Sequence, residues 1–75
     1  MYRSFARSKA HALGLVGTAR NLPDGTVEII AQGEKEKLEK FIVHLQEGSI
    51  FSRVDNVEVL WREPSADFED FRILL

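Results

Sequence analysis

The sequence predicts an α+β domain in which two helices cover one face of an antiparallel sheet. Apolar residues recur at helical spacing in two stretches and alternate at strand spacing in four others, and turn-forming residues separate the stretches. Taken in order, these stretches give an α-β-β-α-β-β succession, which is typical of an α/β sandwich. We expect residues 1–75 to form a single domain, because a chain of this length supports one small core.

The first helix is predicted over residues 3–14. Four of its apolar residues are spaced to share one face: Phe5, Ala6, Ala10 and Leu13. Gly14 suits the position just past a helix end, where the backbone often takes a positive φ. A strand is expected to begin directly after it.

Residues 15–32 are predicted to form a β-hairpin with Leu22 to Gly25 in the connection. Pro23 presets φ, Asp24 can accept a hydrogen bond from the neighbouring backbone, and Gly25 can take a positive φ. Asn21 stands just before this turn, at a strand end. Its side-chain amide there could orient a small polar molecule.

The second helix, predicted over residues 34–45, has the strongest helical pattern in the chain. Its apolar face is spaced at i, i+3, i+4 and i+7, on Leu38, Phe41, Ile42 and Leu45. Glu34 and Glu36 suit the positive end of the helix dipole, and Gly48 is expected to end the helix.

Two further strands are predicted after the link at residues 49–52. In residues 56–61, Val57, Val59 and Trp61 alternate with more polar positions, and Trp61 is expected in the core. The stretch 63–67 interrupts this strand. A short closing strand is expected over residues 71–75.

Composition and charge limit the function classes. The chain has no cysteine, which excludes disulfides and thiolate metal sites, and no apolar run approaches the length of a membrane span. We therefore expect a cytoplasmic protein. Residues 1–23 carry four basic and no acidic side chains, although the whole chain has a net charge of −2. This asymmetry indicates either a small anionic ligand or a solvated helix face, and disfavours nucleic acid, which normally meets a basic stripe with interleaved aromatic residues.

The predicted order lacks one element of a known module. Two helices on one face of an antiparallel sheet are typical of the split β-α-β arrangement, β-α-β-β-α-β, which begins with a strand. Only two residues precede the first helix here. We expect the absence of that central strand to leave strand edges exposed.

The spacing of the hairpin residues resembles a signature of the acylphosphatase family, G-x-x-x-N-x-x-x-G-x-V-x(5)-G. The chain matches this pattern at Gly17, Asn21, Gly25, Val27 and Gly33. Thr18 departs from the aromatic residue common in the family. The resemblance covers essentially all of the chain and implies a ferredoxin-like α/β sandwich that lacks the first strand and most of the phosphate-binding loop. Tyr2 and Arg3 match only the end of the other family signature.

The resemblance implies an acylphosphatase-type hydrolase that cleaves the carboxyl-phosphate bond of small acyl phosphates. By resemblance, Arg3 binds the phosphate, with Tyr2 beside it, and Asn21 orients the attacking water. Small acyl phosphates or inorganic phosphate are the expected ligands, with no cofactor, no metal, no membrane and no nucleic acid. Family members are monomers, and self-association through exposed strand edges is the alternative expected here.

Three other interpretations accompany this one. The chain could be a catalytically weak or inactive acylphosphatase-like domain that acts in partner binding or self-association. A ferredoxin-like RNA-binding module is disfavoured, because the expected aromatic pair within a basic motif is not found. Arg3 and Asn21 could also be an ordinary surface residue and a turn residue. His11 and His44 show no metal-ligand spacing and receive no role.

Overall fold

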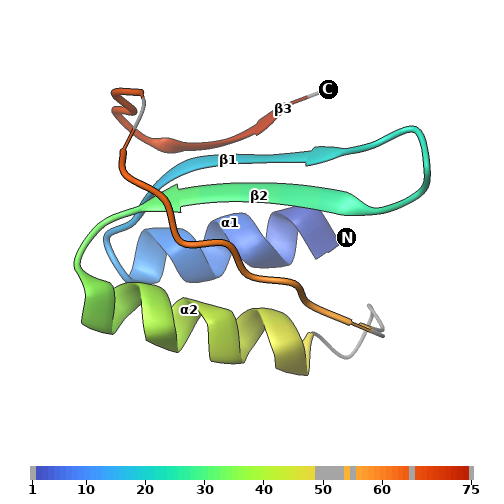
Figure 1. Ribbon diagram of the computed structural model, residues 1–75, viewed down its shortest axis with the longest axis horizontal. Coiled ribbons are helices and arrows are strands. Elements are labelled where there is room, and N and C mark those ends of the chain that lie inside the picture. The colour runs from blue at the N-terminus through green and yellow to red at the C-terminus, as the bar shows by residue number, and fades with distance from the viewer. Residues whose placement is uncertain (1, 49–53, 55, 65, 75) are drawn as a thin grey trace.

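The computed structural model describes residues 2–48, 54, 56–64 and 66–74, in two layers (Figure 1). The chain forms, in order, helix α1, strands β1 and β2, helix α2 and strand β3. Their bounds are Tyr2–Ala12, Val16–Asn21, Val27–Gln32, Lys35–Glu47 and Phe71–Leu74. The predicted helices, hairpin and closing strand are thus confirmed within the described residues, while Leu75 and the predicted link at 49–52 lie outside them.

The sheet has the strand order β2-β1-β3. Strands β1 and β2 pair antiparallel through the hairpin, with Val16 opposite Gln32 and Asn21 opposite Val27. Strands β1 and β3 pair parallel, so the prediction of a wholly antiparallel sheet is wrong. Side chains alternate with the same period in parallel and antiparallel strands, so the sequence pattern does not give the direction of a strand. The direction of β3 depends on the long connection that follows α2.

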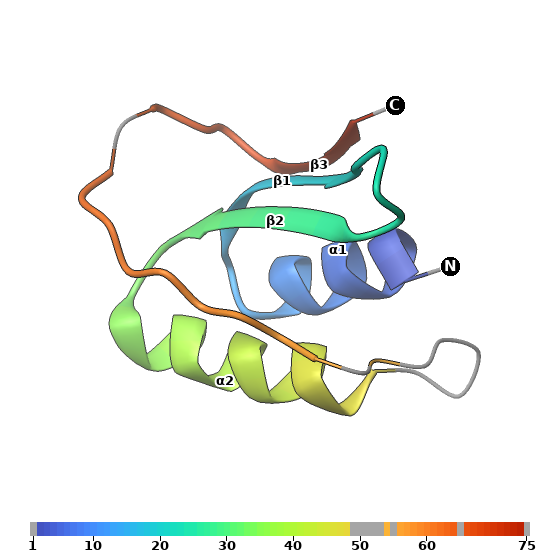
Figure 2. The ribbon, with the colours of Figure 1, turned by 45° about the vertical axis from the view of Figure 1, so that its right-hand side comes forward.

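Both helices pack on the same face of the sheet, as predicted, and the core lies between the two layers (Figure 2). Among the described residues, seven side chains are buried there: Ala6, Ala10, Leu15, Ala19, Phe41, Leu45 and Phe71. The Phe41 and Phe71 rings meet edge to face with centroids 5.9 Å apart, which joins α2 to the closing strand. The two alanines of α1 let that helix approach β1 closely.

The end of α1 sets the direction of β1. Gly14 has a φ of 70°, and the Leu15 N–H donates to the Ala10 carbonyl at 2.9 Å while the Gly14 N–H donates to the His11 carbonyl at 3.1 Å. These two bonds make a Schellman motif, which satisfies carbonyls at the helix end. The predicted role of Gly14 is confirmed.

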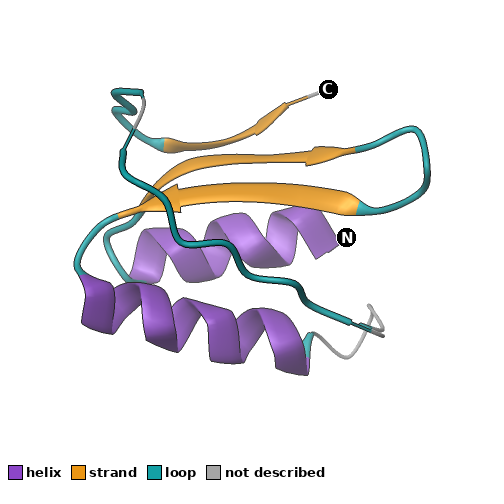
Figure 3. Ribbon diagram, in the orientation of Figure 1, coloured by secondary structure: helices purple, strands orange, loops and turns teal. Residues whose placement is uncertain are grey.

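The strand predicted over residues 56–61 is wrong. Residues 56–64 run as an irregular extended segment in front of the helices (Figure 3). Trp61, expected in the core, has 56% of its surface exposed, and the neighbouring Leu60 has 77% exposed. A strand pattern forms a strand only where a neighbour takes up its backbone hydrogen bonds, and no described residue pairs with this segment.

Candidate functional site

Arg3 lies in the first turn of α1, with its side chain half-buried. Its Nη1 donates a hydrogen bond to the main-chain carbonyl of Leu74, 3.2 Å away in β3. One bond leaves most of the five guanidinium N–H groups for other acceptors. The first turn of α1 contains no acidic side chain, so nothing in that turn neutralises the arginine or the positive end of the helix dipole.

Asn21 is the last residue of β1 and is exposed. Its side chain lies on the same face of the sheet as Ala19, because residues two apart on a strand share a face. Ala19 is fully buried against the helices, so Asn21 faces the helix layer just beyond the edge of the core. This places the amide at the end of the sheet where β1 enters the hairpin.

The structure brings Arg3 and Asn21 to the same end of the molecule. Arg3 is bonded to Leu74, and Leu74 pairs with Arg20, the immediate neighbour of Asn21. The start of α1, the end of β1 and the end of β3 lie together in both views (Figures 1 and 2). A guanidinium, a side-chain amide and a helix N-terminus therefore lie at the same end of the sheet.

The turn after β1 holds Asn21 in place. The Leu22 N–H donates to the Thr26 carbonyl at 2.8 Å, and the Gly25 N–H donates to the Leu22 carbonyl at 3.0 Å. Asp24 accepts from both the main-chain N–H and the hydroxyl of Thr26, at 2.9 and 2.6 Å. The hydroxyl bond, followed by the main-chain bond, lowers the pKa of Asp24. The turn chemistry predicted for this segment is confirmed.

Tyr2 lies next to Arg3 but directs its side chain elsewhere. Its hydroxyl donates to the Leu45 carbonyl of α2 at 2.8 Å, and its ring lies 6.0 Å from that of Phe5. Burial raises the pKa of this hydroxyl. The side chain thus joins the two helices, and only the main-chain amide of Tyr2 is left to face a ligand at the helix start.

The family of this chain follows from its sequence as a whole. A family model described as acylphosphatase matches residues 1–73. The chain belongs to the acylphosphatase family. An acylphosphatase from Thermus thermophilus is 56% identical over 62 residues, which are 83% of this chain and 70% of that protein. One from Caldanaerobacter subterraneus is 45% identical over 65 residues, 87% of this chain and 72% of the relative.

Solved acylphosphatases share the fold as well. The crystal structure of acylphosphatase from Bacillus subtilis is similar with a TM-score of 0.92 and 31% sequence identity, over 99% of this chain and 82% of that one. The α+β, ferredoxin-like class predicted from the sequence is therefore confirmed, with the mixed sheet noted above. The family makes this an acylphosphatase-type hydrolase, for which acyl phosphates are the implied substrates.

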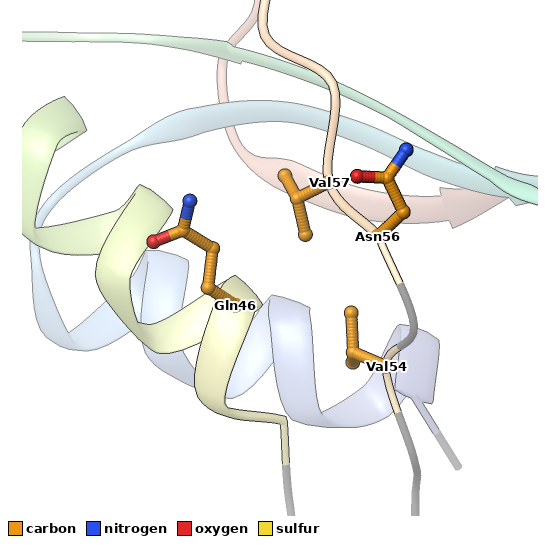
Figure 4. Close-up of a pocket in the computed structure, with 4 residues that line it drawn as sticks. All are labelled: Gln46, Val54, Asn56 and Val57. Atoms are coloured by element: carbon orange, nitrogen blue, oxygen red, sulfur yellow. The ribbon is translucent and has the colours of Figure 1, made fainter.

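Two open hollows lie on the surface. One, of about 230 Å³, is lined by Gln46 of α2 and by Val54, Asn56 and Val57 (Figure 4). The other, of about 270 Å³, lies at the start of β3 and is lined by Gly17, Thr18, Asp67, Phe68, Glu69, Asp70 and Arg72. Three carboxylates against one guanidinium make the second hollow unsuitable for a phosphate. The first hollow adjoins Leu45, which accepts the hydrogen bond from Tyr2, and its lining contains no cationic side chain.

His11, to which the sequence assigned no role, makes contacts between distant parts of the chain. Its Nε2 lies 3.1 Å from Asp70 Oδ1 and 3.2 Å from the Phe71 carbonyl oxygen. Because that carbonyl only accepts, Nε2 carries a proton and donates. No local sequence signal indicates a contact between residues so far apart.

Within residues 2–48, 54, 56–64 and 66–74, no group of three or more histidine or acidic side chains is placed to hold a metal ion. In the same part of the chain, neither helix is long and apolar enough to cross a bilayer.

Proposed function

We propose that this chain hydrolyses small acyl phosphates at the end of the sheet where α1 begins and β1 ends. Arg3 binds the phosphate and Asn21 orients the attacking water. The observation that supports this proposal is that the two residues lie at the same end of the sheet, linked through the Arg3–Leu74 bond and the pairing of Leu74 with Arg20, the neighbour of Asn21. The inactive, partner-binding alternative lacks a comparable observation at this end.

Arg3 suits the phosphate because of its geometry as well as its charge. A guanidinium presents parallel N–H groups that bind two phosphate oxygens at once, which a lysine cannot reproduce. The bond from Nη1 to Leu74 fixes one side of the fork and orients the rest toward solvent at the helix start. Preorganised charge of this kind stabilises the charge that develops during phosphoryl transfer.

The helix start completes the anion site. The first amides of α1, including that of Tyr2, have no acceptor within the helix and carry partial positive charge. An anion at this end is stabilised by both the amides and the guanidinium. The expected contribution of Tyr2 to phosphate binding is therefore assigned to its main-chain N–H.

Asn21 positions the water. Its side-chain carbonyl oxygen accepts a hydrogen bond from the water and so fixes the position of that water. An acyl phosphate is an activated mixed anhydride, so a water held in line with phosphorus attacks without a covalent enzyme intermediate. The water oxygen bonds to phosphorus as the bond from phosphorus to the acyl oxygen breaks, the carboxylate leaves, and a phosphate oxygen takes the proton from the water. Positioning and electrostatics supply the rate.

Hydrolysis of benzoyl phosphate by four proteins tests these roles. Relative to the unaltered chain, Arg3→Ala should lower kcat/KM by about 10- to 150-fold, the value of one or more lost charge-assisted bonds. It should also weaken competitive inhibition by inorganic phosphate. Asn21→Ala should lower kcat and leave phosphate inhibition nearly unchanged, because it contacts water rather than the bound anion.

Arg7→Ala is the matched control, since Arg7 is an exposed arginine one turn further along α1. Its kcat/KM should stay within about twofold of the unaltered chain, as for most surface substitutions. Circular dichroism of every variant separates loss of the site from loss of the fold. Equal activity of the Arg3→Ala and Arg7→Ala proteins would contradict the assignment of Arg3.

The predicted cytoplasmic location is retained as part of this proposal. A diffusible acyl phosphate is a small charged substrate, and its hydrolysis needs only water.

A further inference from the structure

Strand β3 forms an edge of the sheet, and its sequence suits further strand pairing. Among the described residues, β1 pairs with one side of β3 and no strand pairs with the other. The strand reads Phe-Arg-Ile-Leu, without proline, and its register with β1 has no bulge. The extended segment of residues 56–64 leads instead to the β2 edge, where the Ala66 carbonyl accepts from Gln32 Nε2 at 2.9 Å (Figure 1). An edge strand of this kind needs protection from pairing with other chains.

Phe71 turns its backbone groups toward this outer edge. The Gly17 N–H donates to the Asp70 carbonyl at 2.9 Å, while Gly17 itself pairs with Phe71. In a parallel ladder with this register, β1 bonds to the residues on either side of Phe71. The N–H and C=O of Phe71 therefore point away from β1. Ile73 pairs with Ala19 in the same register, so its N–H and C=O also point to the outer edge.

Two side chains occupy the outward groups of Phe71. Asp70 Oδ1 accepts a hydrogen bond from the Phe71 N–H at 2.8 Å. His11 Nε2 donates to the Phe71 carbonyl at 3.2 Å and lies 3.1 Å from the same Asp70 oxygen. The side chains of His11 and Asp70, here called the edge cap, thus hold each other beside the strand. Both are partly exposed, so they lie where an added strand would lie.

We propose that the edge cap prevents β3 from pairing with β3 of a second copy of the chain. In an antiparallel pair about a two-fold axis at Arg72, Phe71 lies opposite Ile73 of the second copy. These two residues exchange both of their hydrogen bonds, and the axis repeats the exchange. Every hydrogen bond of this register therefore uses Phe71 of one copy or the other, and the cap blocks all of them at a single residue.

Arg72 adds a second barrier to the same register. Its side chain lies on the face of the sheet opposite that of the buried Phe71, because successive residues of a strand alternate. An axis at Arg72 sets the two guanidinium groups opposite each other, which is destabilising. Moving the axis to Ile73 avoids this repulsion but leaves, within the described residues, only the exchange between the two Ile73 backbones. The inference does not depend on the proposed reaction.

Sedimentation of a variant without the cap tests the proposal. His11→Ala/Asp70→Ala frees both outward groups of Phe71. Its dimer dissociation constant should be lower than that of the unaltered chain by about tenfold or more, because hydrogen bonds at Phe71 become available to a second copy. His44→Ala/Asp67→Ala is the matched control, since it removes the same residue types from positions that do not bond to Phe71. The control should sediment as the unaltered chain does.

A conservative variant separates the cap from other effects of these residues. His11→Gln/Asp70→Asn keeps a donor for the Phe71 carbonyl and an acceptor for its N–H, so it should sediment as the unaltered chain does. Circular dichroism checks the fold of each protein. If the double alanine variant loses its native spectrum, His11→Ala alone supplies the measurement. It frees the carbonyl only and should lower the dissociation constant by a smaller factor.

Cysteine crosslinking tests the register, because the chain has no cysteine of its own. On an axis at position 72, opposite Cα atoms of a non-hydrogen-bonded pair lie about 4.5 Å apart, within the range that a disulfide spans. Arg72→Cys should give several-fold more covalent dimer on mild oxidation when the cap is removed than when it is present. Val43→Cys without the cap is the control, because Val43 is 54% exposed on α2 and lies off this edge.

Three results would overturn the proposal. One is a capless protein with a native spectrum and the same dissociation constant as the His44→Ala/Asp67→Ala control. Another is an equal yield of crosslinked Arg72→Cys with and without the cap. The third is equal crosslinking at positions 43 and 72 without the cap, which would place self-association at some other surface.

Discussion

At the scale of single residues, the contact between His11 and Asp70 links the site to the rest of the sheet. Asp70 Oδ1 accepts from the Phe71 N–H at 2.8 Å as well as from His11. These bonds hold the start of β3 against α1. The other end of β3 carries Leu74, whose carbonyl holds Arg3. An exposed pair thus helps to place the strand whose carbonyl holds Arg3, the proposed phosphate ligand.

The pKa of Asp70 predicts a dependence of stability on pH. The hydrogen bond from the Phe71 N–H, and then the positive charge of His11, lower this pKa in the folded state. The Asp70 carboxylate binds a proton more readily in the unfolded chain than in the folded one. Its contribution to stability is therefore fully present above the ordinary pKa of an aspartate, and it is lost as pH falls through the lowered pKa of the folded state. Asp70→Asn should therefore show a smaller fall in unfolding free energy between about pH 5 and pH 2.

Urea unfolding at several pH values measures this difference. Asp67→Asn is the control, because it removes an equal charge from the same exposed segment. If the two asparagine variants give the same pH dependence, the bonds to Asp70 do not stabilise the fold.

The candidate site could be predicted from the sequence only through its resemblance to a family. A lone arginine near a terminus and an asparagine before a turn have no signal of their own. The signature spacing selected Asn21, and the fold then accounts for its nearness to Arg3. The Arg3–Leu74 and His11–Asp70 contacts could not be predicted, because each joins residues about 60 or 70 positions apart.

At the scale of elements, the glycines of the hairpin should differ sharply in their tolerance of substitution. Gly17 has a φ of 147°, and a Cβ there would overlap the main-chain carbonyl of Ile30 on the paired strand. Gly25 has a φ of 90° in the turn, but a Cβ there would meet open space. Gly25→Ala should cost about 1–2 kcal/mol of backbone strain, and Gly17→Ala about 3 kcal/mol or more, since the ladder must also shift.

Chemical denaturation of the two alanine variants checks the difference. Activity supplies an independent readout, because Gly17 shares β1 with Asn21 while Gly25 lies in the following turn. A loss of stability that is equal in both variants would show that the pairing of β1 with β2 adapts to a side chain.

The helices and the hairpin were predictable because their signals are local. Helical spacing, the Gly14 end of α1 and the turn at Leu22–Gly25 act within a few residues of one another. The strand at 56–61 and the direction of β3 depend on which strands lie beside them. Alternating Val57, Val59 and Trp61 describe a strand that is covered on one face, but the described sheet offers it no partner.

At the scale of the whole molecule, the core is small. In the part of the chain that the structure describes, seven buried side chains, three of them alanine, hold the two layers together. A domain of this length is expected to have a stability of roughly 4–11 kcal/mol. A ligand that stabilises the folded state by a few kcal/mol therefore adds a large fraction to the free energy of unfolding.

Phosphate binding at the proposed site should accordingly raise the thermal stability of the chain. A ligand that binds only the folded state stabilises it by about 1.4 kcal/mol at ten times its dissociation constant. For a domain of this size that raises Tm by about 6 to 11 °C. Inorganic phosphate at that ratio should give this increase in the unaltered chain, and a much smaller one in Arg3→Ala, which loses the guanidinium.

The comparison with Arg3→Ala is needed because phosphate also strengthens apolar burial in any protein, by exclusion from the surface. That general effect should be the same in both proteins, and in the control Arg7→Ala. Sodium chloride at matched ionic strength accounts for screening of the basic residues in the first third of the chain. A phosphate-dependent rise in Tm that is equal in all three proteins would mean that Arg3 does not bind the anion.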